Sequence, residues 1–128
     1  MTAKTNKPGI LLVDDDSLWR ETLNVILGTG DFDVVGEASN GEAALSMCRQ
    51  CTPGVVLLDI NMPGMDGIAV LQAIRKEFPA ISVIMISAEA TLDRVKEAIA
   101  EGASGFVVKP FNSGRVIDDI NAVIQRKK

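Results

Sequence analysis

Five short apolar runs, each followed by an amphipathic segment, restrict this chain to few folds. The runs are rich in Val and Ile, as strands covered on both faces are, and they span residues 10–13, 34–35, 55–58, 81–86 and 106–108. Helical periodicity marks the segments that follow them, at about 17–27, 42–51, 67–78, 92–101 and 114–125. Because parallel strands need a return connection of about a dozen residues, this alternation predicts a parallel sheet with helices on both faces.

The predicted architecture is an α/β fold, a three-layer sandwich around a five-stranded parallel sheet. A chain of 128 residues suits one domain, which we place at residues 9–126. We expect a disordered N-terminal tail at 1–8 and a short C-terminal end at 127–128. The expected strand order, 2-1-3-4-5, is that of flavodoxin-like proteins and does not follow from the pattern itself.

Several polar residues and one glycine indicate where the helices begin and end. Ser39 and Glu42 have the spacing of a capping box, which predicts a helix start at this point. Gly102 stands where the fourth helix would end. Three further residues are predicted N-caps, namely Asp16, Asp66 and Thr91.

Charge and hydropathy exclude several classes of function. The chain has 13 Lys and Arg against 17 Asp and Glu, a net charge of −4, and its basic residues are scattered, so we expect no direct nucleic-acid binding. No apolar run reaches the roughly 18 residues of a membrane helix, and the polar start lacks a secretory signal, which favours a cytoplasmic protein without membrane contact. Histidine is absent, so any phosphohistidine must come from a partner.

Two cysteines, Cys48 and Cys51, have the spacing of a redox pair. They lie near the C-terminal end of a predicted helix rather than at a helix start, where a thiolate would be favoured. We therefore expect two reduced, partly packed thiols, to which the sequence assigns no role.

Polar residues that could bind a ligand or take part in a reaction follow four of the five predicted strands. These are Asp14–Asp16 after the first strand, Asp59 after the third, Ser87 after the fourth and Lys109 after the fifth; the second strand offers only Glu37. In open sheets of this kind, ligands bind outside the carboxyl ends of the strands. The sequence therefore predicts a functional site at that edge.

Three acidic side chains at one edge would repel each other unless a positive charge lies among them. With the first and third strands adjacent, Asp14, Asp15 and Asp59 would meet there, and Mg²⁺ suits oxygen ligands of this kind. Lys109 adds a positive charge that could pair with a phosphate or with Asp59. A carboxylate is also a nucleophile toward phosphorus, so we interpret Asp59 as a group held out for phosphorylation.

Taken singly, each of these residues also has an ordinary interpretation. Asp59 could begin a turn before Asn61, the acidic pair could cap a helix, and Ser87 could be a turn hydroxyl. Lys109 could be a surface lysine. Their coincidence at the ends of four strands favours the functional interpretation.

The residues that carry this pattern resemble the CheY-like receiver domains of two-component response regulators. The resemblance runs from about residue 9 to residue 124 and depends on ILLVDDD, VVLLDINMPGMDG, VIMISA and GFVVKPF, in that order. It implies that Asp59 is the phosphoacceptor. It also implies that Asp15, Asp59 and the backbone carbonyl of Asn61 hold Mg²⁺, with Asp14 as the other member of the acidic pair.

The same resemblance implies roles for residues around the acidic cluster. Ser87 and Lys109 would contact the phosphoryl oxygens, and the peptide bond between Lys109 and Pro110 would be cis. Phe106 would be the aromatic switch that responds to Ser87. Asn61 and Glu89 would tune the rate of hydrolysis, although Glu89 could equally be an ordinary exposed acid.

A receiver of this family implies partners rather than turnover of a substrate. A sensor histidine kinase or a phosphotransfer protein would supply the phosphoryl group, and the fourth helix, fifth strand and fifth helix would form the face that a downstream protein recognises. The chain would catalyse only its own phosphorylation and dephosphorylation, and so would be a signalling switch.

Three alternatives stay open at this point. A Mg²⁺-dependent aspartyl-phosphate phosphatase would need an acid two residues after Asp59, where this chain has the amide Asn61. Nucleotide binding of the flavodoxin type would need a Gly- or Ser-rich loop after the first strand, where this chain has three aspartates. The chain could also be the N-terminal receiver of a longer DNA-binding response regulator rather than a stand-alone regulator.

Overall fold

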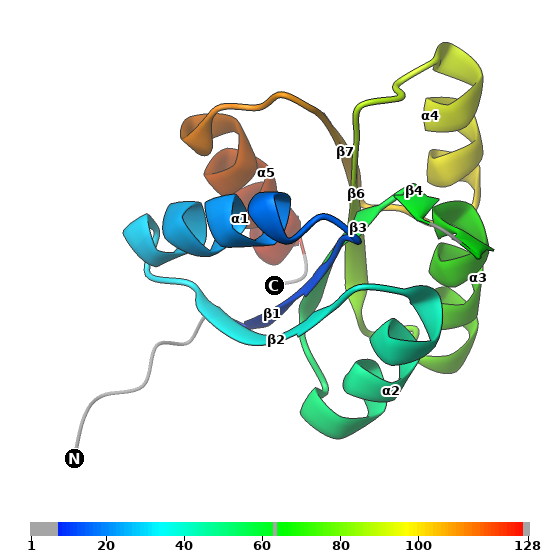
Figure 1. The fold of residues 1–128 in the computed structure, drawn as a ribbon, viewed down its shortest axis with the longest axis horizontal. Helices are drawn as coiled ribbons and strands as arrows, with labels where there is room; N and C mark the ends of the chain where they lie inside the picture. The colour runs from blue at the N-terminus through cyan, green and yellow to red at the C-terminus, as the bar shows by residue number, and fades with distance from the viewer. Residues whose placement is uncertain (1–7, 63, 127–128) are drawn as a thin grey trace.

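The predicted parallel sheet is present in the computed structural model, which describes residues 8–62 and 64–126 (Figure 1). Its strands are β1 (Gly9–Val13), β2 (Asp33–Ala38), β3 (Val55–Asp59), β6 (Ser82–Ser87) and β7 (Gly105–Val108). They lie in the order β2-β1-β3-β6-β7 and pair in parallel, which matches the predicted order of main strands. The structure also has a short antiparallel pair that was not predicted, β4 (Asn61–Met62) and β5 (Met65–Asp66). The fourth and fifth strands of the main sheet are therefore labelled β6 and β7.

Five helices cover the two faces of the sheet. Helices α1 (Ser17–Thr29) and α5 (Ser113–Arg126) lie on one face. The other face is covered by α2 (Gly41–Cys51), α3 (Gly67–Glu77) and α4 (Leu92–Ala100). The predicted three-layer α/β sandwich is therefore confirmed, with helix bounds that differ from the prediction by one or two residues.

Each central strand contributes alternate side chains to two separate hydrophobic layers. In β1, Leu11 and Val13 pack under α2 and α3, whereas Ile10 and Leu12 pack under α1 and α5. The same alternation continues through β3 and β6, whose side chains are almost all buried. Each such side chain contributes about 1.5–3 kcal/mol when it leaves water, so the two layers fix the register that places the strand ends.

Helix ends agree with the sequence signals at all but one position. Asp16, Asp66 and Thr91 are N-caps as predicted, each with a side-chain oxygen that accepts a backbone N–H of its helix. Gly102 follows α4 with a φ of 101°, which suits glycine. The prediction that Ser39 begins α2 in a capping box with Glu42 is wrong, because the N-cap of α2 is Asn40.

The error at α2 concerns which of two adjacent polar residues turns the chain into the helix. The Asn40 side chain accepts the N–H of Ala43 at 2.8 Å, and Asn40 itself has an extended backbone. Both Ser and Asn are good N-caps, so the choice depends on where the strand before them ends rather than on residue type.

The predicted tail at 1–8 and the C-terminal end at 127–128 lie outside the described residues, apart from Pro8. Within 8–62 and 64–126, each helix is too short or too polar to cross a bilayer.

Candidate functional site

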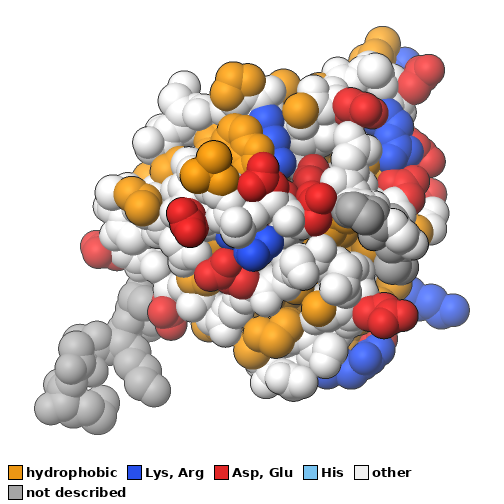
Figure 2. Space-filling model, in the orientation of Figure 1, with side chains coloured by type: hydrophobic (Ala, Val, Ile, Leu, Met, Phe, Trp, Pro, Cys, Tyr) orange, Lys and Arg blue, Asp and Glu red, His pale blue; other side chains and the backbone are white. Residues whose placement is uncertain are grey.

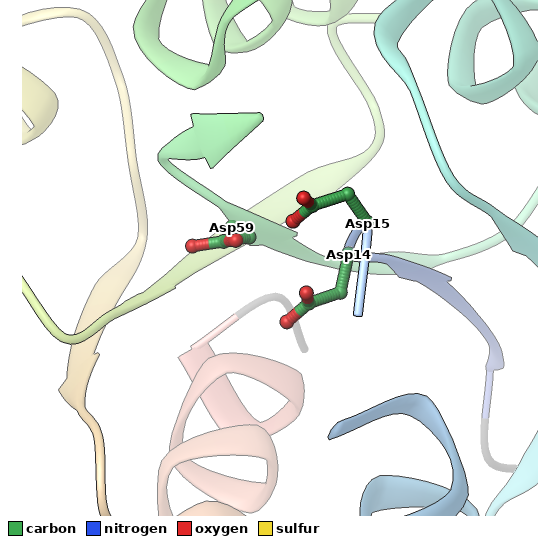
Figure 3. Close-up of side chains that lie close together, drawn as sticks. All are labelled: Asp14, Asp15 and Asp59. Carbon is green, nitrogen blue, oxygen red and sulfur yellow. The ribbon is translucent and has the colours of Figure 1, made fainter. Parts of the chain in front are cut away.

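The ends of two neighbouring strands bring the predicted acidic residues together. Strands β1 and β3 pair with Val13 opposite Leu58, so Asp14 and Asp59, which come next, lie side by side. Asp15 follows on the loop to α1. Oxygens from Asp14, Asp15 and Asp59 all lie within 4.8 Å of one another, and Figure 3 shows the three side chains around a common space.

Two of these carboxylates are buried, and one lysine lies beside them. Asp14 is 3% exposed and Asp59 is 6% exposed, whereas Asp15 is exposed to solvent. The Lys109 ammonium donates to Asp14 Oδ2 at 2.7 Å, and its nitrogen is 3.8 Å from Asp59 Oδ2. We expected Lys109 to face Asp59 or a phosphate, but its hydrogen-bond partner is Asp14.

Burial of Asp59 has a clear electrostatic consequence. Loss of hydration raises the pKa of Asp59 from 3.8 to about 6, and the negative charges of Asp14 and Asp15 add to this rise. The Lys109 charge and the Asn61 N–H, which points at Asp59 Oδ1 from 3.4 Å, lower the pKa but do not cancel the rise. Asp59 therefore sits in an environment where its negative charge is unfavourable.

The donor set fits a hard divalent cation. With every group ionised, three carboxylates and one ammonium sum to a charge of −2, which one divalent cation would balance. Two carboxylates at this separation repel by about 3 kcal/mol at moderate dielectric, so a cation among them would relieve a substantial repulsion. Oxygen ligands of this type are those that Mg²⁺ takes in proteins, through one or two carboxylates and retained waters.

An open cavity adjoins the acidic cluster on the side of α3 and α4. Its volume is about 410 Å³. The residues that line it are Asp15, Ile60, Asn61, Met62, Asp66 and Arg94. Because Asp15 and Asn61 both face this space, a cation and its remaining ligands could be reached from solvent here. The sequence did not indicate Arg94, which pairs with Asp66 at 2.7 Å across the cavity.

Several hydrogen bonds fix the loop between β1 and α1, which carries Asp14 and Asp15. The backbone N–H of Asp16 donates to Asp14 Oδ1 at 2.9 Å, and the Arg20 guanidinium donates to the Asp14 carbonyl. Arg20 in turn pairs with Glu37 at 3.0 Å, and Asn24 donates to the same carboxylate. Glu37, the one polar residue that the second strand offered, therefore supports the loop that carries Asp14 through its contact with Arg20.

Gly67 lets the start of α3 pack closely against the backbone at the end of β3. The Gly67 N–H donates to the Ile60 carbonyl at 2.7 Å, which joins the start of α3 to the end of β3. A Cβ at Gly67 would lie 2.4 Å from the Asp59 carbonyl oxygen and 2.5 Å from the Ile60 Cα. Only glycine permits this approach, so Gly67 fixes the path of the segment that contains Asn61.

Of the predicted accessory residues, Asn61 contacts Asp59 and Lys109 contacts Asp14, and the roles of all of them stay predictions. Ser87 ends β6, is fully buried, and accepts the N–H of Glu89 at 3.0 Å. The register pairs Asp59 with Ile86, so Ser87 lies one residue further along the neighbouring strand. Phe106 is partly buried against the layer under α3 and α4, and Glu89 is exposed. The Lys109–Pro110 bond is cis, as the resemblance implied.

Trp19, which the sequence pattern did not indicate, lies on the first turn of α1 beside Lys109. Its ring lies over the Lys109 ammonium, with the nitrogen 4.8 Å from the ring centroid. The Phe111 ring also packs against it, with the two ring centroids 5.2 Å apart. The only signal in the sequence is one tryptophan close behind an acidic strand end, which by itself indicates no contact with Lys109.

The two cysteines match the expectation of ordinary packed thiols. Neither is in a disulfide; Cys48 is buried, and Cys51 is partly buried near the Val35 carbonyl. Burial raises the pKa of the Cys48 thiol to about 11, with the Glu77 charge adding to the rise. Such a thiol is protonated at neutral pH and is a poor nucleophile.

On the face drawn in Figure 2, basic and acidic side chains are interspersed, and the basic ones form no continuous stripe. This distribution agrees with the net charge of −4.

Together, the five-stranded parallel sheet and the acidic strand ends around the buried Asp59 define an α/β domain with an acidic site at the carboxyl edge of its sheet. The chain belongs to the response regulator receiver domain family, whose model matches residues 10–121.

Its relatives include both small and large proteins. The chain is 40% identical over 115 residues to chemotaxis protein CheY of Bacillus subtilis, covering 90% of this chain and 96% of that protein. It is 39% identical to response regulator protein FleR of Pseudomonas aeruginosa, covering 85% of this chain but 23% of that protein. A solved CheX-CheY-BeF3-Mg+2 complex from Borrelia burgdorferi matches with a TM-score of 0.88 and 33% identity, covering 91% of this chain and 88% of that chain.

Proposed function

We propose that this receiver domain is a Mg²⁺-dependent phosphoacceptor, in which Asp59 takes a phosphoryl group from the phosphohistidine of a partner kinase or phosphotransfer protein. The observation that supports this most strongly is the cluster of three carboxylates with Lys109 beside it, at the carboxyl edge of the sheet. A similar protein was solved in a complex that contains Mg²⁺ and BeF3, and the trigonal shape of BeF3 resembles that of a phosphoryl group.

Asp59, Lys109 and the cation ligands would have different roles in the phosphoryl transfer. An Asp59 carboxylate oxygen would attack phosphorus while the bond from phosphorus to the donor nitrogen breaks, and the imidazole would leave with the partner. Lys109, 3.8 Å from Asp59 Oδ2, would move toward the transferred oxygens and balance part of their charge. A cation held by Asp14, Asp15, Asp59 and the Asn61 carbonyl would supply further charge stabilisation when bound.

The donor must lie outside this chain because the chain has no histidine. The open cavity beside Asp15 and Asn61 leaves the acidic edge accessible to a partner's side chain. We infer that the chain is a signalling switch rather than an enzyme that turns over a substrate. Asn61 supports this, since an amide cannot act as the general acid that a phosphatase would need there.

Output would follow from a rearrangement on the side of α4, β7 and α5. Ser87 would shift toward the new phosphoryl oxygens, and Phe106 would move into the space it leaves. Three large hydrophobic side chains are exposed on α4 and β7, namely Leu92, Ile99 and Val108. A downstream protein would recognise this face as a separate partner, or a further domain would contact it if the chain is part of a longer protein; the chain covers only 23% of the length of FleR.

The proposal is tested by intact-mass measurement after incubation with Mg²⁺ and acetyl phosphate. The wild type should gain the mass of one phosphoryl group, and Asp59→Asn should gain none, because an amide nitrogen or oxygen does not replace the carboxylate nucleophile. Asp118→Asn, an exposed carboxylate on α5, is the matched control and should react like the wild type. An adduct on both Asp59→Asn and the wild type, or on neither, would overturn the proposal.

A further inference from the structure

The hydrogen bond to Asp14 alone does not fix the position of the Lys109 ammonium. Within residues 8–62 and 64–126, the acceptor of this ammonium is Asp14 at 2.7 Å, while Asp59 at 3.8 Å is too distant for a second hydrogen bond. The side chain is 7% exposed, so water can reach little of it. A lysine has four rotatable bonds, and a single hydrogen bond leaves the ammonium free to swing about Asp14.

The ring of Trp19 limits that freedom on the side of α1. Lys109 Nζ lies 4.8 Å from the ring centroid, inside the about 6 Å over which an aromatic face attracts a cation. The Phe111 ring, 5.2 Å away and tilted by 45°, packs against Trp19, and Phe111 itself packs on the layer under α1 and α5. The indole therefore contacts both the Lys109 ammonium and the Phe111 ring.

We propose that Trp19 is a positioning residue that keeps the Lys109 ammonium between Asp14 and Asp59, ready for the oxygens of a phosphoryl group on Asp59. The inference rests on the proposed function. The aromatic face replaces water on one side of the ammonium, and aromatic attraction and the Asp14 hydrogen bond hold it from two directions. Without the ring, water would compete for the ammonium and Lys109 would spend less time near Asp59.

The test compares rates of adduct formation with acetyl phosphate and saturating Mg²⁺, followed by intact mass over time. Trp19→Leu keeps apolar cover but removes the aromatic face, and a desolvated cation–π contact corresponds to a slowing of about 5- to 30-fold. Trp19→Phe keeps a smaller aromatic face and should recover part of the rate; it also serves if Trp19→Leu folds poorly. Phe78→Leu removes a partly buried aromatic ring from the other layer and should react like the wild type.

A double-mutant cycle with Lys109→Gln separates positioning from general damage to the fold. If Trp19 acts through Lys109, adding Trp19→Leu to Lys109→Gln should slow the reaction no further. Slowing of the double variant by the product of the two single effects would overturn the inference. Equal rates for the wild type and Trp19→Leu would also overturn it and would leave the proposed function intact.

The contact itself is tested without any phosphodonor. Trp19 is the only tryptophan of the chain, so its emission reports on this position alone. Lys109→Gln should change the emission because the charge over the ring is lost, and an unchanged spectrum would contradict the contact. Absence of an adduct in the wild type would instead overturn the proposed function, and with it the reaction that Trp19 would serve.

Discussion

Replacement of Asp59 by Asn should make the domain more stable at neutral pH in the absence of Mg²⁺. The substitution keeps the volume of the side chain and removes a negative charge that is buried beside Asp14 and near Asp15. Lys109 keeps its 2.7 Å hydrogen bond to Asp14 in the variant. The main effect should therefore be relief of an unfavourable charge rather than loss of a contact.

The raised pKa of Asp59 gives the size and sign of this effect. Its value rises from 3.8 to about 6 in the folded chain, so between these pH values the folded state binds more protons than the unfolded state. The free energy of unfolding of the wild type therefore falls as pH rises through this window. The rise in the pKa of Asp59 limits this fall to about 3 kcal/mol. Asp59→Asn lacks this loss and should exceed the wild type by about 1–3 kcal/mol above pH 7.

Urea denaturation in EDTA, followed by Trp19 emission, measures the free energy of unfolding. At pH 4 Asp59 is mainly protonated in the folded chain, and at pH 7.5 it is mainly ionised. The advantage of Asp59→Asn should be present at pH 7.5 and small at pH 4, and Mg²⁺ should reduce it at pH 7.5 because the cation stabilises only the wild-type folded state. Asp118→Asn should lie within about 0.5 kcal/mol of the wild type at either pH. A variant less stable than the wild type at pH 7.5, or an advantage of equal size at both pH values, would refute the reasoning.

Four further substitutions and one chemical probe test the rest of the structure. Gly67→Ala places a Cβ too close to the Asp59 carbonyl oxygen and should lower the free energy of unfolding in urea by about 1–3 kcal/mol. Gly28→Ala, in a helix with open space around it, should raise that free energy by about 0.5–1 kcal/mol. Asn40→Ala should cost about 1 kcal/mol by the same assay and Ser39→Ala should cost clearly less; the reverse order would contradict the N-cap assignment. In the folded protein, Cys48 should react with a thiol reagent at pH 8 only as fast as the chain unfolds, because burial raises its pKa to about 11; rapid labelling would disagree.

Much of the fold follows from the sequence because burial on both faces leaves a strong periodic signal. The apolar runs of β1, β3 and β6 contribute to both layers, so their length and Val/Ile content already mark them as central strands. The end of each run then gives the position of the acidic and basic residues at the carboxyl edge. The strand order needed a known fold, since the apolar pattern does not say which strands are adjacent.

Side-chain geometry at the site could not be predicted in the same way. Lys109 and Asp14 are 95 residues apart, and whether the ammonium meets Asp14 or Asp59 depends on the path of a flexible stem between two loops. Trp19 shows the same limit, since a single aromatic residue on a helix packs into a core more often than it covers a lysine. The choice of Asn40 over Ser39 as N-cap depends on where β2 ends, and the short apolar run there did not mark that end.

The central claim is that carboxylates from two neighbouring strand ends bind one Mg²⁺ around Asp59, and calorimetric titration with Mg²⁺ tests it most directly. The wild type and Asp118→Asn should bind one ion per chain, and Asp15→Asn and Asp59→Asn should each bind about tenfold more weakly or worse, because each loses a charged oxygen ligand. Equal affinity in all four proteins, or binding that survives loss of both carboxylates, would contradict the account.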